Sequence, residues 1–383
     1  MKVVIAGGGT GGHIYPGIAI AKALQTVNIK TQILFIGSEE GIEKNILPKE
    51  RLSLVTIKSR GMLRKLSYKA VSAPFVLVAG FIQSLKVLKT FKPDAVVVTG
   101  GYVSLPVALA AFVRRIPILL HEENLKPGLS TRIIKWIARV VTTSFEGTKK
   151  YLKFKKRVYC FGNPVREAVI KTLRGVAIQN LGYKQNDRIV LIMGGSQGAR
   201  SINQTIIDAL PLFEGMNIQI LHVSGERDHE WIRGQNLGSR HLFYRLVPYM
   251  HNLADGLAAA DLVVSRAGAT AISEIAVRGI PSILIPFPFS SGRHQDLNAK
   301  LMADAGASHI IWNKDLNAKV LVEEIKHILN NKDLREFMGN SARGLGRPDA
   351  AEGIVKMIYN ITGQDEMLTR RKGRKVKIDK EKH

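Results

Sequence analysis

The sequence predicts an α/β fold made of two Rossmann-like domains, each with a parallel sheet. Short apolar, β-branched runs alternate with helix-like stretches along the chain, as in βαβ units. The succession of strand, glycine-rich turn and helix also occurs twice, over residues 3–24 and again over residues 188–210. At 383 residues and 45% hydrophobic, the chain is long enough to build two hydrophobic cores.

The strands fall into two groups separated by a turn-rich segment. Residues 161–164 read Phe-Gly-Asn-Pro, which is typical of a turn and indicates the hinge. We therefore expect domains at 1–162 and 163–347, followed by an amphipathic helix within 348–363 and a basic, disordered tail at 364–383. The expected strands are 3–6, 32–36, 95–99, 118–121 and 140–143, then 188–193, 218–223, 262–265 and 282–286.

The first glycine turn is the strongest local signal for a ligand. Residues 7–12 match G-x-G-x-x-G, and Pro16 lies near the first turn of the helix that we expect over residues 15–24. Glycines let backbone N–H groups approach a ligand, and a helix N-terminus favours a diphosphate. A nicotinamide or flavin site stays open, with Glu39 or Glu40 as the acidic residue after the second strand. A turn that only packs is the other alternative, although His13 follows it directly.

Polar residues gather after several other expected strands, where α/β proteins build their sites. We expect a ligand role for Asn124 and structural roles for His121 and Glu122. Arg166 either meets a phosphate or forms an ion pair between domains, and Glu274 either binds ribose hydroxyls or is a charge on a helix face. The polar segments are 99–102, 121–124, 163–166, 194–198, 265–274 and 293–298.

The net charge of +25 predicts an anionic partner, either nucleic acid or a membrane face. Zinc-finger spacing and RNA-binding aromatic motifs are absent from the sequence, so no specific nucleic acid is expected. Basic residues flank an apolar stretch at 75–85, which favours a surface lying on anionic lipid over a core helix with lysines on its wet face. The proposed membrane residues are Arg64, Lys65, Lys69, Phe75, Phe81, Ile82 and Lys86.

Other features limit the functional classes. The lone Cys160 fits a reducing compartment, no signal peptide is evident, and no uninterrupted apolar run reaches the ~18–20 residues needed to span a bilayer. No Asp-x-Asp and no metal-ligand spacing of His and Cys occurs, so no metal or other cofactor is expected.

Seven motifs in register resemble one family. Together they resemble the MurG family of undecaprenyldiphospho-muramoylpentapeptide β-N-acetylglucosaminyltransferases, in glycosyltransferase family 28, over residues 1–363. The motifs are GGTGGH (8–13), TGGYVS (99–104), HEEN (121–124), GNPVR (162–166), GGSQGA (194–199), RAGAT (266–270) and SEIA (273–276).

The resemblance implies a GT-B fold, with two Rossmann-like domains facing a central cleft and the last helix returning to the first domain. It implies inverting, metal-independent transfer of GlcNAc from UDP-GlcNAc to the 4-hydroxyl of the MurNAc of lipid I, giving lipid II and UDP. It also implies a peripheral enzyme on the cytoplasmic side of the cell membrane.

Matching positions carry the family's binding roles to this chain. Glu274 would hold the ribose, and the first glycine turn is also a seat for the acceptor's diphosphate. His13 would be the general base on the acceptor hydroxyl, or would orient the diphosphate. The family more often has Gln at positions 123 and 294, so Glu123 receives no role. The substrate-binding positions are Thr10, Gly11, Gly12, Asn124, Arg166, Ser196, Met250, Ala269, Thr270, Ala271, Ile272, Ser273, Glu274 and Gln295.

Three other functions compete with this interpretation. A dehydrogenase would bind a nicotinamide at residues 7–12. A related lipid glycosyltransferase would use diacylglycerol as its acceptor, although the sequences of the motifs at 162–166 and 194–199 favour lipid I. A nucleic-acid binder would bind DNA or RNA in a salt-dependent manner.

Overall fold

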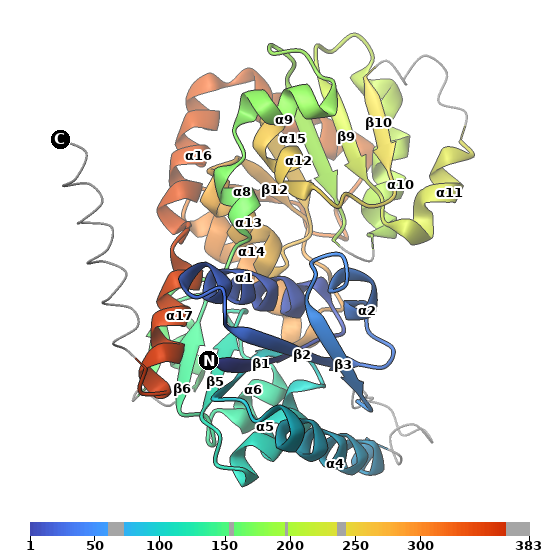
Figure 1. Cartoon of the computed structure of the whole chain (residues 1–383). Coiled ribbons are helices and arrows are strands. Elements are labelled where there is room, and N and C mark those ends of the chain that lie inside the picture. Colours follow the sequence, from blue (N-terminus) through green and yellow to red (C-terminus); the bar gives the residue numbers. More distant parts are fainter. Residues whose placement is uncertain (60–72, 153–156, 196–197, 236–242, 365–383) are drawn as a thin grey trace, which may run out of the picture. The chain divides into compact units, whose positions relative to one another are not determined.

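The structure is a computed structural model that describes residues 1–59, 73–152, 157–195, 198–235 and 243–364. The chain divides into two compact units, one of Met1–Pro164 with the segment from Asp349 onwards and one of Val165–Pro348 (Figure 1). Arg64, Lys65, Lys69 and Ser196, together with the basic tail from residue 365, lie outside the described residues.

The N-terminal unit contains a seven-stranded sheet in which every pairing is parallel, in the order β3-β2-β1-β4-β5-β6-β7. The strand order reverses between β1 and β4, which pair directly. The strands are β1 (Lys2–Gly7), β2 (Gln32–Ser38), β3 (Ser53–Ile57), β4 (Ala95–Gly100), β5 (Ile118–Glu122), β6 (Val140–Thr143) and β7 (Val158–Cys160).

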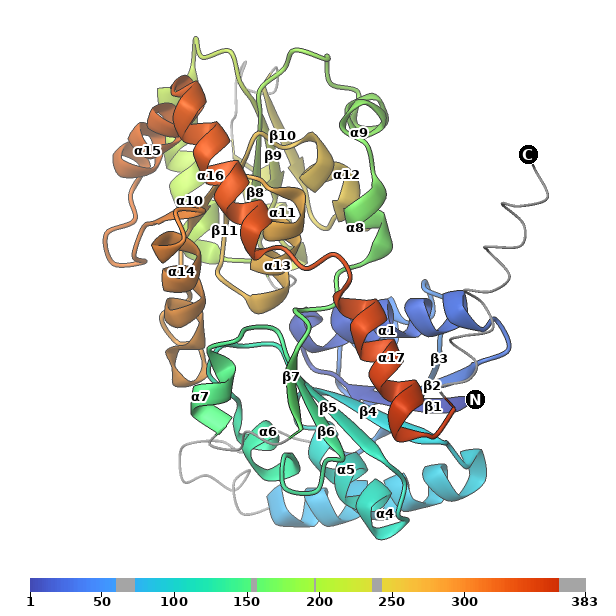
Figure 2. The same ribbon diagram turned by 90° about the vertical axis from the view of Figure 1, so that its left-hand side faces the viewer.

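Alternating residues of β1 supply two cores, one on each face of this sheet. Val3 and Ile5 pack with α1 and α17, while Val4 and Ala6 pack with α4 and α5 (Figures 1 and 2). Such continuous burial on both faces is expected of a parallel sheet covered by helices. The helices of this unit are α1 (Gly11–Val27), α2 (Glu43–Ile46), α4 (Ala73–Phe91), α5 (Ser104–Val113), α6 (Leu129–Ile134), α7 (Thr148–Leu152) and α17 (Ala350–Ile361).

The C-terminal unit repeats the architecture with a six-stranded parallel sheet in the order β10-β9-β8-β11-β12-β13. Its order reverses between β8 and β11. The strands are β8 (Ile189–Met193), β9 (Gln219–Val223), β10 (Tyr244–Val247), β11 (Leu262–Ser265), β12 (Ser282–Leu284) and β13 (Ser308–Ile310).

Helices cover both faces of the second sheet. α10 and α15 pack on the face formed by Val190 and Ile192, and α12 packs against β8 from the other side through Leu191. The helices are α8 (Glu167–Lys171), α9 (Arg174–Leu181), α10 (Arg200–Ala209), η1 (Leu210–Phe213), α11 (Glu226–Arg233), α12 (Leu253–Ala259), α13 (Ala269–Arg278), η3 (Ser291–Arg293), α14 (His294–Asp304), α15 (Ala318–Asn330) and α16 (Lys332–Leu345).

The predicted fold class of two parallel-sheet α/β domains is confirmed, with two differences in detail. Four strands were missed: β3, β7, β10 and β13 lie at or beside sheet edges, and β7 and β13 have three residues each, too few to show a pattern. Helix α1 also begins at Gly11 rather than Tyr15, so that Pro16 lies inside it. The amide that proline lacks would have paired with the carbonyl of Gly12, four residues earlier.

Candidate active site

Both units place their glycine turns where the strand order reverses. In an open parallel sheet, this reversal leaves a crevice beyond the carboxyl ends of two neighbouring strands. In the N-terminal unit the turn after β1 and the segment after β4 meet at this point. In the C-terminal unit the turn after β8 and the start of α13 follow β8 and β11, the two strands that pair at the reversal. The predicted segments 99–102, 194–198 and 265–274 therefore follow strands at the reversal points, whereas 121–124, 163–166 and 293–298 follow other strands.

The first glycine turn is shaped by close backbone contacts. Gly9 has a φ of 83°, and Thr10 is the N-cap of α1, with Gly11 and Gly12 in the helix's first turn. A Cβ at Gly101, after β4, would lie 2.4 Å from the carbonyl oxygen of Gly8. The two segments thus contact each other through bare backbone, and the N–H groups at the start of α1 lie at the crevice.

Glu43 is a site residue that the sequence analysis missed. Its carboxylate is fully buried beneath the glycine turn and accepts hydrogen bonds from the backbone N–H of Gly9 (3.1 Å) and of Ser38 (2.5 Å). Glu39 and Glu40, proposed for a dinucleotide ribose, lie instead in an exposed turn after β2. Glu43 is therefore the acidic residue after β2 that supports the first glycine turn.

His13, in the first turn of α1, forms an ion pair with Glu123. The Nδ1 atom of His13 lies 2.7 Å from Oε2 of Glu123 and 3.1 Å from the carbonyl oxygen of Thr99. The side chain of His13 is 26% exposed and that of Glu123 only 3% exposed. No role was expected for Glu123, and its contact with His13, 110 residues away, is a finding of the structure.

The environment of this pair changes both pKa values. Burial alone lowers the pKa of His13, but the charge and hydrogen bond of Glu123, with help from Glu122, outweigh burial and raise it to about 9. Burial raises the pKa of Glu123 to about 7 although His13 opposes the shift. The pair therefore favours a proton on His13 near neutral pH.

The other polar residues at the end of β5 have hydrogen-bond partners close by. His121 lies 3.0 Å from the hydroxyl of Thr142 and 3.3 Å from Oδ1 of Asn163, and burial lowers its pKa to about 4. The carboxylate of Glu122 accepts from the backbone N–H and the side-chain amide of Asn124 (2.9 and 3.3 Å). These contacts agree with the structural roles expected of His121 and Glu122.

Most of the substrate-binding residues predicted in the C-terminal unit follow the carboxyl ends of its strands, whereas Arg166 precedes β8. Met250 follows β10 and approaches α12, where a Cβ at Gly256 would lie 3.0 Å from its sulfur. Gln295, in α14 after β12, accepts from the backbone N–H of Phe287 (2.9 Å). Residues 269–274, namely Ala269, Thr270, Ala271, Ile272, Ser273 and Glu274, form the first turns of α13 after β11.

Arg166 and Glu274 form an ion pair within this unit. Nε and Nη2 of Arg166 donate to Oε1 of Glu274 at 3.1 and 2.8 Å, and the two side chains are 16% and 4% exposed. Arg166 is the N-cap of α8, and Glu274 lies on α13. The ion pair that the sequence analysis placed between domains as one alternative therefore lies inside one unit.

Arg266, directly after β11, forms hydrogen bonds to segments near the carboxyl ends of β12 and β13. Its Nη1 donates to the carbonyl of Ile285 and to Oδ1 of Asn313, and its Nη2 to the hydroxyl of Ser201. Burial lowers the pKa of Arg266 to about 10. These bonds connect the segments after β11 and β12 with α10.

A buried network supports the second glycine turn from behind. Nδ1 of His222 lies 2.8 Å from the hydroxyl of Tyr244, and the amide of Asn203 donates to the carbonyl of Ser224. A Cβ at Gly198 (φ 72°) would lie 2.3 Å from that same carbonyl. Glycine is therefore required where the turn packs on the end of β9.

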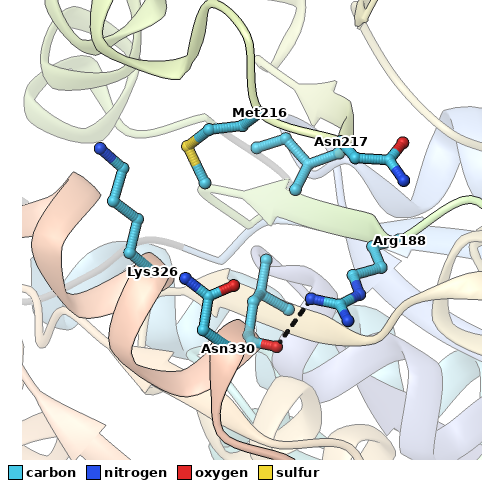
Figure 3. Close-up of a pocket in the computed structure, with 7 residues that line it drawn as sticks. Arg188, Met216, Asn217, Lys326 and Asn330 are labelled. Atoms are coloured by element: carbon cyan, nitrogen blue, oxygen red, sulfur yellow. Dashed lines mark hydrogen bonds between the residues drawn. The ribbon is translucent and has the colours of Figure 1, made fainter.

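Two surface pockets of the C-terminal unit lie elsewhere. One of about 180 Å³ is lined by Arg188, Met216 and Lys326, with Nη1 of Arg188 donating to the carbonyl of Leu329 (Figure 3). A larger one includes Asp261 and Pro281. Arg188, Asp261 and Pro281 directly precede β8, β11 and β12, so these pockets lie by the amino ends of the strands, away from the crevice.

Helix α4 presents an apolar surface. Phe75 is 75% exposed and Ile82 48% exposed, whereas Phe81 is half-buried against the core, and Lys86 is exposed on the same helix. The window Pro74–Phe91 has a mean hydropathy of 1.3, so by length and composition this helix is able to cross a membrane. It nevertheless packs along α5 in the described fold.

Exposed apolar side chains continue onto α5 and the neighbourhood of α6. Phe112 and Val113 at the end of α5 are 55% and 63% exposed, and Trp136 just after α6 is 70% exposed. The ammonium of Lys135 lies 4.8 Å from the centre of the Trp136 ring. We call these residues, with the exposed residues of α4, the α4–α6 face.

Comparison with known proteins places this site in a family. The model of the glycosyltransferase family 28 N-terminal domain matches residues 3–143, and that of the C-terminal domain matches residues 189–354. A protein from Caldanaerobacter subterraneus subsp. tengcongensis is 40% identical over 366 residues, covering 94% of this chain and 100% of that protein. The chain belongs to glycosyltransferase family 28.

Several family 28 relatives share one name. The Caldanaerobacter protein and one from Desulforamulus reducens, 38% identical over 94% of this chain and 99% of its own, are both named UDP-N-acetylglucosamine–N-acetylmuramyl-(pentapeptide) pyrophosphoryl-undecaprenol N-acetylglucosamine transferase. The crystal structure of Acinetobacter baumannii MurG matches with a TM-score of 0.72 at 27% identity, covering 94% of this chain and 99% of that one. A Neisseria meningitidis UDP-GlcNAc 2-epimerase shares the fold alone, with a TM-score of 0.68 at 17% identity, covering 94% of this chain and 100% of its own.

Proposed function

We propose that this chain transfers GlcNAc from UDP-GlcNAc to the 4-hydroxyl of the MurNAc of lipid I, with inversion, giving lipid II and UDP. The observation that carries the proposal is its identity of about 40% over 94% of its length to relatives named for this transfer. The matched length extends through both units, so the glycine turns and most strand-end segments lie within the compared regions.

In this mechanism His13 is the general base. Its ring lies at the N-terminus of α1, beside backbone N–H groups suited to the acceptor's diphosphate. Nδ1 is occupied by Glu123 and Thr99, so Nε2 is the nitrogen that takes the proton of the acceptor hydroxyl. Thr10, Gly11, Gly12 and Asn124 are the proposed substrate contacts in this unit.

On the donor side, the C-terminal unit binds UDP. Oε1 of Glu274 accepts from the guanidinium of Arg166, and Oε2 accepts from the ribose hydroxyls. The guanidinium therefore orients the carboxylate of Glu274 and itself lies beside the diphosphate. The turn after β8 and the N-terminus of α10, with Ser196, stabilise the negative charge that grows on the leaving UDP. Met250 and residues 269–273 cover the uridine, and Gln295 binds the sugar.

We further propose that the protein is peripheral on the cytoplasmic side of the cell membrane and binds anionic lipid through the α4–α6 face. Phe75, Ile82 and Trp136 are exposed there, next to exposed basic residues such as Lys86. Apolar side chains that enter the interface and cations that meet lipid headgroups act together in such binding. The packing of α4 along α5 favours a helix that lies on the membrane over one that crosses it.

The transfer is tested with labelled UDP-GlcNAc and a lipid I analogue, with diacylglycerol as the alternative acceptor. We expect label in a lipid II product and none in a glycosyl diacylglycerol. Label on diacylglycerol alone would assign the chain to the other class of lipid glycosyltransferase. Calorimetry with NAD and NADP is expected to show no binding at the first glycine turn.

Membrane binding is tested by sedimentation with vesicles of anionic or neutral lipid. The double variant Phe75→Ser/Ile82→Ser is expected to release the protein from anionic vesicles, because it removes apolar area that would enter the bilayer. Phe337→Ser is the matched control, because Phe337 is 60% exposed on α16 of the other unit. Equal loss with both variants would contradict the assignment of this face.

A further inference from the structure

The ion pair between His13 and Glu123 goes beyond what the proposed reaction requires. A base needs a ring nitrogen near the acceptor hydroxyl, but it does not need a buried carboxylate on the other nitrogen. Glu123 comes from the segment directly after β5, and its carboxylate is 3% exposed. Its Oε1 is buried without a hydrogen-bond partner among the described residues.

A carboxylate buried in this way is costly unless an opposite charge compensates it. Oε2 contacts Nδ1 of His13 at 2.7 Å, and Glu122 adds a second negative charge close by. The compensation for Glu123 must therefore come mainly from His13. The arrangement is most stable when the imidazole carries a second proton, which is the state that a general base reaches during proton transfer.

The surroundings also fix the ring's orientation. Glu123 and the carbonyl of Thr99 are both acceptors at Nδ1, so this nitrogen carries the proton in the neutral ring. A Cβ at Gly100 would lie 2.5 Å from Nδ1, so the backbone of β4's end packs directly against the imidazole. Nε2 is thereby kept as the acceptor nitrogen.

We propose that Glu123 is a positioning residue that holds His13 in the Nδ1–H form and stabilises the imidazolium formed as Nε2 accepts the acceptor's proton. The inference rests on the proposed function of His13 as base. In the step, the O–H bond of the 4-hydroxyl breaks and an N–H bond forms at Nε2. The hydroxyl oxygen's electron pair forms the bond to the anomeric carbon, while the bond from that carbon to UDP breaks and its electrons leave with UDP.

A pH dependence follows from this arrangement. The charged groups facing His13 among the described residues are Glu123 and Glu122, and both favour the protonated ring. Neutral His13 is the form that acts as base, so the acidic limb of the rate profile lies above the ordinary pKa of histidine, ~6.5. Replacing Glu123 by an uncharged residue must move that limb to lower pH.

The first experiment follows His13 itself, without substrates. The full-length protein is labelled in its histidines, and the ring signals are titrated by NMR; the signal lost in His13→Gln identifies His13. We expect Glu123→Gln to lower its titration midpoint by one pH unit or more, while Glu123→Asp keeps it above ~6.5 because the charge remains. Glu50→Gln, on the surface beside Lys22, is the matched control and leaves the midpoint unchanged.

The second experiment measures kcat/KM for the lipid I analogue against pH. Glu123→Gln is expected to shift the acidic limb downward by the same interval and to lower the plateau about 10- to 100-fold, with KM for UDP-GlcNAc unchanged. Glu123→Asp should recover part of the plateau. If Glu123→Gln does not fold, the comparison rests on Glu123→Asp, which must lower the plateau while retaining the raised limb.

The outcomes separate this inference from the proposed function. An unchanged His13 midpoint in Glu123→Gln would overturn the inference whatever the enzyme's activity. A lowered midpoint with an unmoved acidic limb would overturn it too, because the pair would then be structural only. Absence of transfer to lipid I by the wild type, with the midpoint shift present, would reject the proposed function and leave the pairing established.

Discussion

Replacing Glu43 should loosen the first glycine turn without touching any substrate-binding side chain. The two oxygens of its buried carboxylate accept from different backbone amides, Oε2 from Gly9 and Oε1 from Ser38. Glutamine has the same shape but one oxygen and one NH₂ group. Glu43→Gln therefore keeps one hydrogen bond and turns an amide donor against one of the two backbone N–H groups.

The cost follows from burial and crowding. Hydrogen bonds to a charged group contribute about 1.5–3 kcal/mol, and an unsatisfied buried donor costs about 1–3 kcal/mol. Water has little room to replace the lost bond, because Cβ atoms at Gly8, Gly37 and Gly41 would all lie within 2.5 Å of the Glu43 side chain. We expect a local destabilisation of about 2–4 kcal/mol.

Native-state hydrogen exchange is the appropriate assay, because a chain of two units has no single unfolding free energy. Exchange at the Gly9 and Ser38 amides is expected to accelerate about 30- to 1,000-fold in Glu43→Gln, and KM for the lipid I analogue to rise. Glu39→Gln, four residues earlier and exposed, is the control. Unchanged protection at both amides would refute the role of Glu43 as the support of the turn.

Three further changes test the site. His13→Ala is expected to lower turnover at least 100-fold while leaving the Kd for UDP-GlcNAc within about threefold, since a base acts only on the acceptor; an unchanged rate would remove His13 from catalysis. Arg166→Met should destabilise the C-terminal unit by about 3–5 kcal/mol in denaturant titration, because it leaves Glu274 buried without its partner. The double variant Arg166→Met/Glu274→Met should regain much of that loss. Equal destabilisation by the single and double variants would argue against the pair. Transfer should continue in excess EDTA, measured with the labelled donor; complete loss that only a divalent ion restores would contradict charge stabilisation by the helix N-terminus and Arg166.

The sequence was sufficient for the features that short-range patterns determine. The β-branched runs predicted most strands, and the glycine turns fall where the strand order of each sheet reverses, because that order follows from successive βαβ units. That ligands bind at these turns stays a prediction. Arg166 and Glu274 were both singled out, since each lies within a recognisable motif. What the sequence did not reveal was that they contact each other.

The missed residues have partners that are distant along the chain. Glu123 lies 110 residues from His13, and Glu43 lies 34 residues from Gly9. Periodicity carries no information on such pairs, and the exposed Glu39 and Glu40 stand closer to the expected position after β2 than Glu43 does. An acidic residue close to Gly37 and Gly41 was the available signal for Glu43, because small neighbours leave room for a carboxylate turned back under a loop.

The return of α17 to the first unit has a consequence during protein synthesis. Ile354 and Tyr359 of α17 complete the core that contains Ile20 and Leu24 of α1. Those α1 side chains are made early, yet their covering helix leaves the ribosome only after about 350 residues have been translated. The continuous second unit can thus finish folding first, and a nascent chain stalled or cleaved before Ala350 would expose an apolar groove that invites chaperones and aggregation.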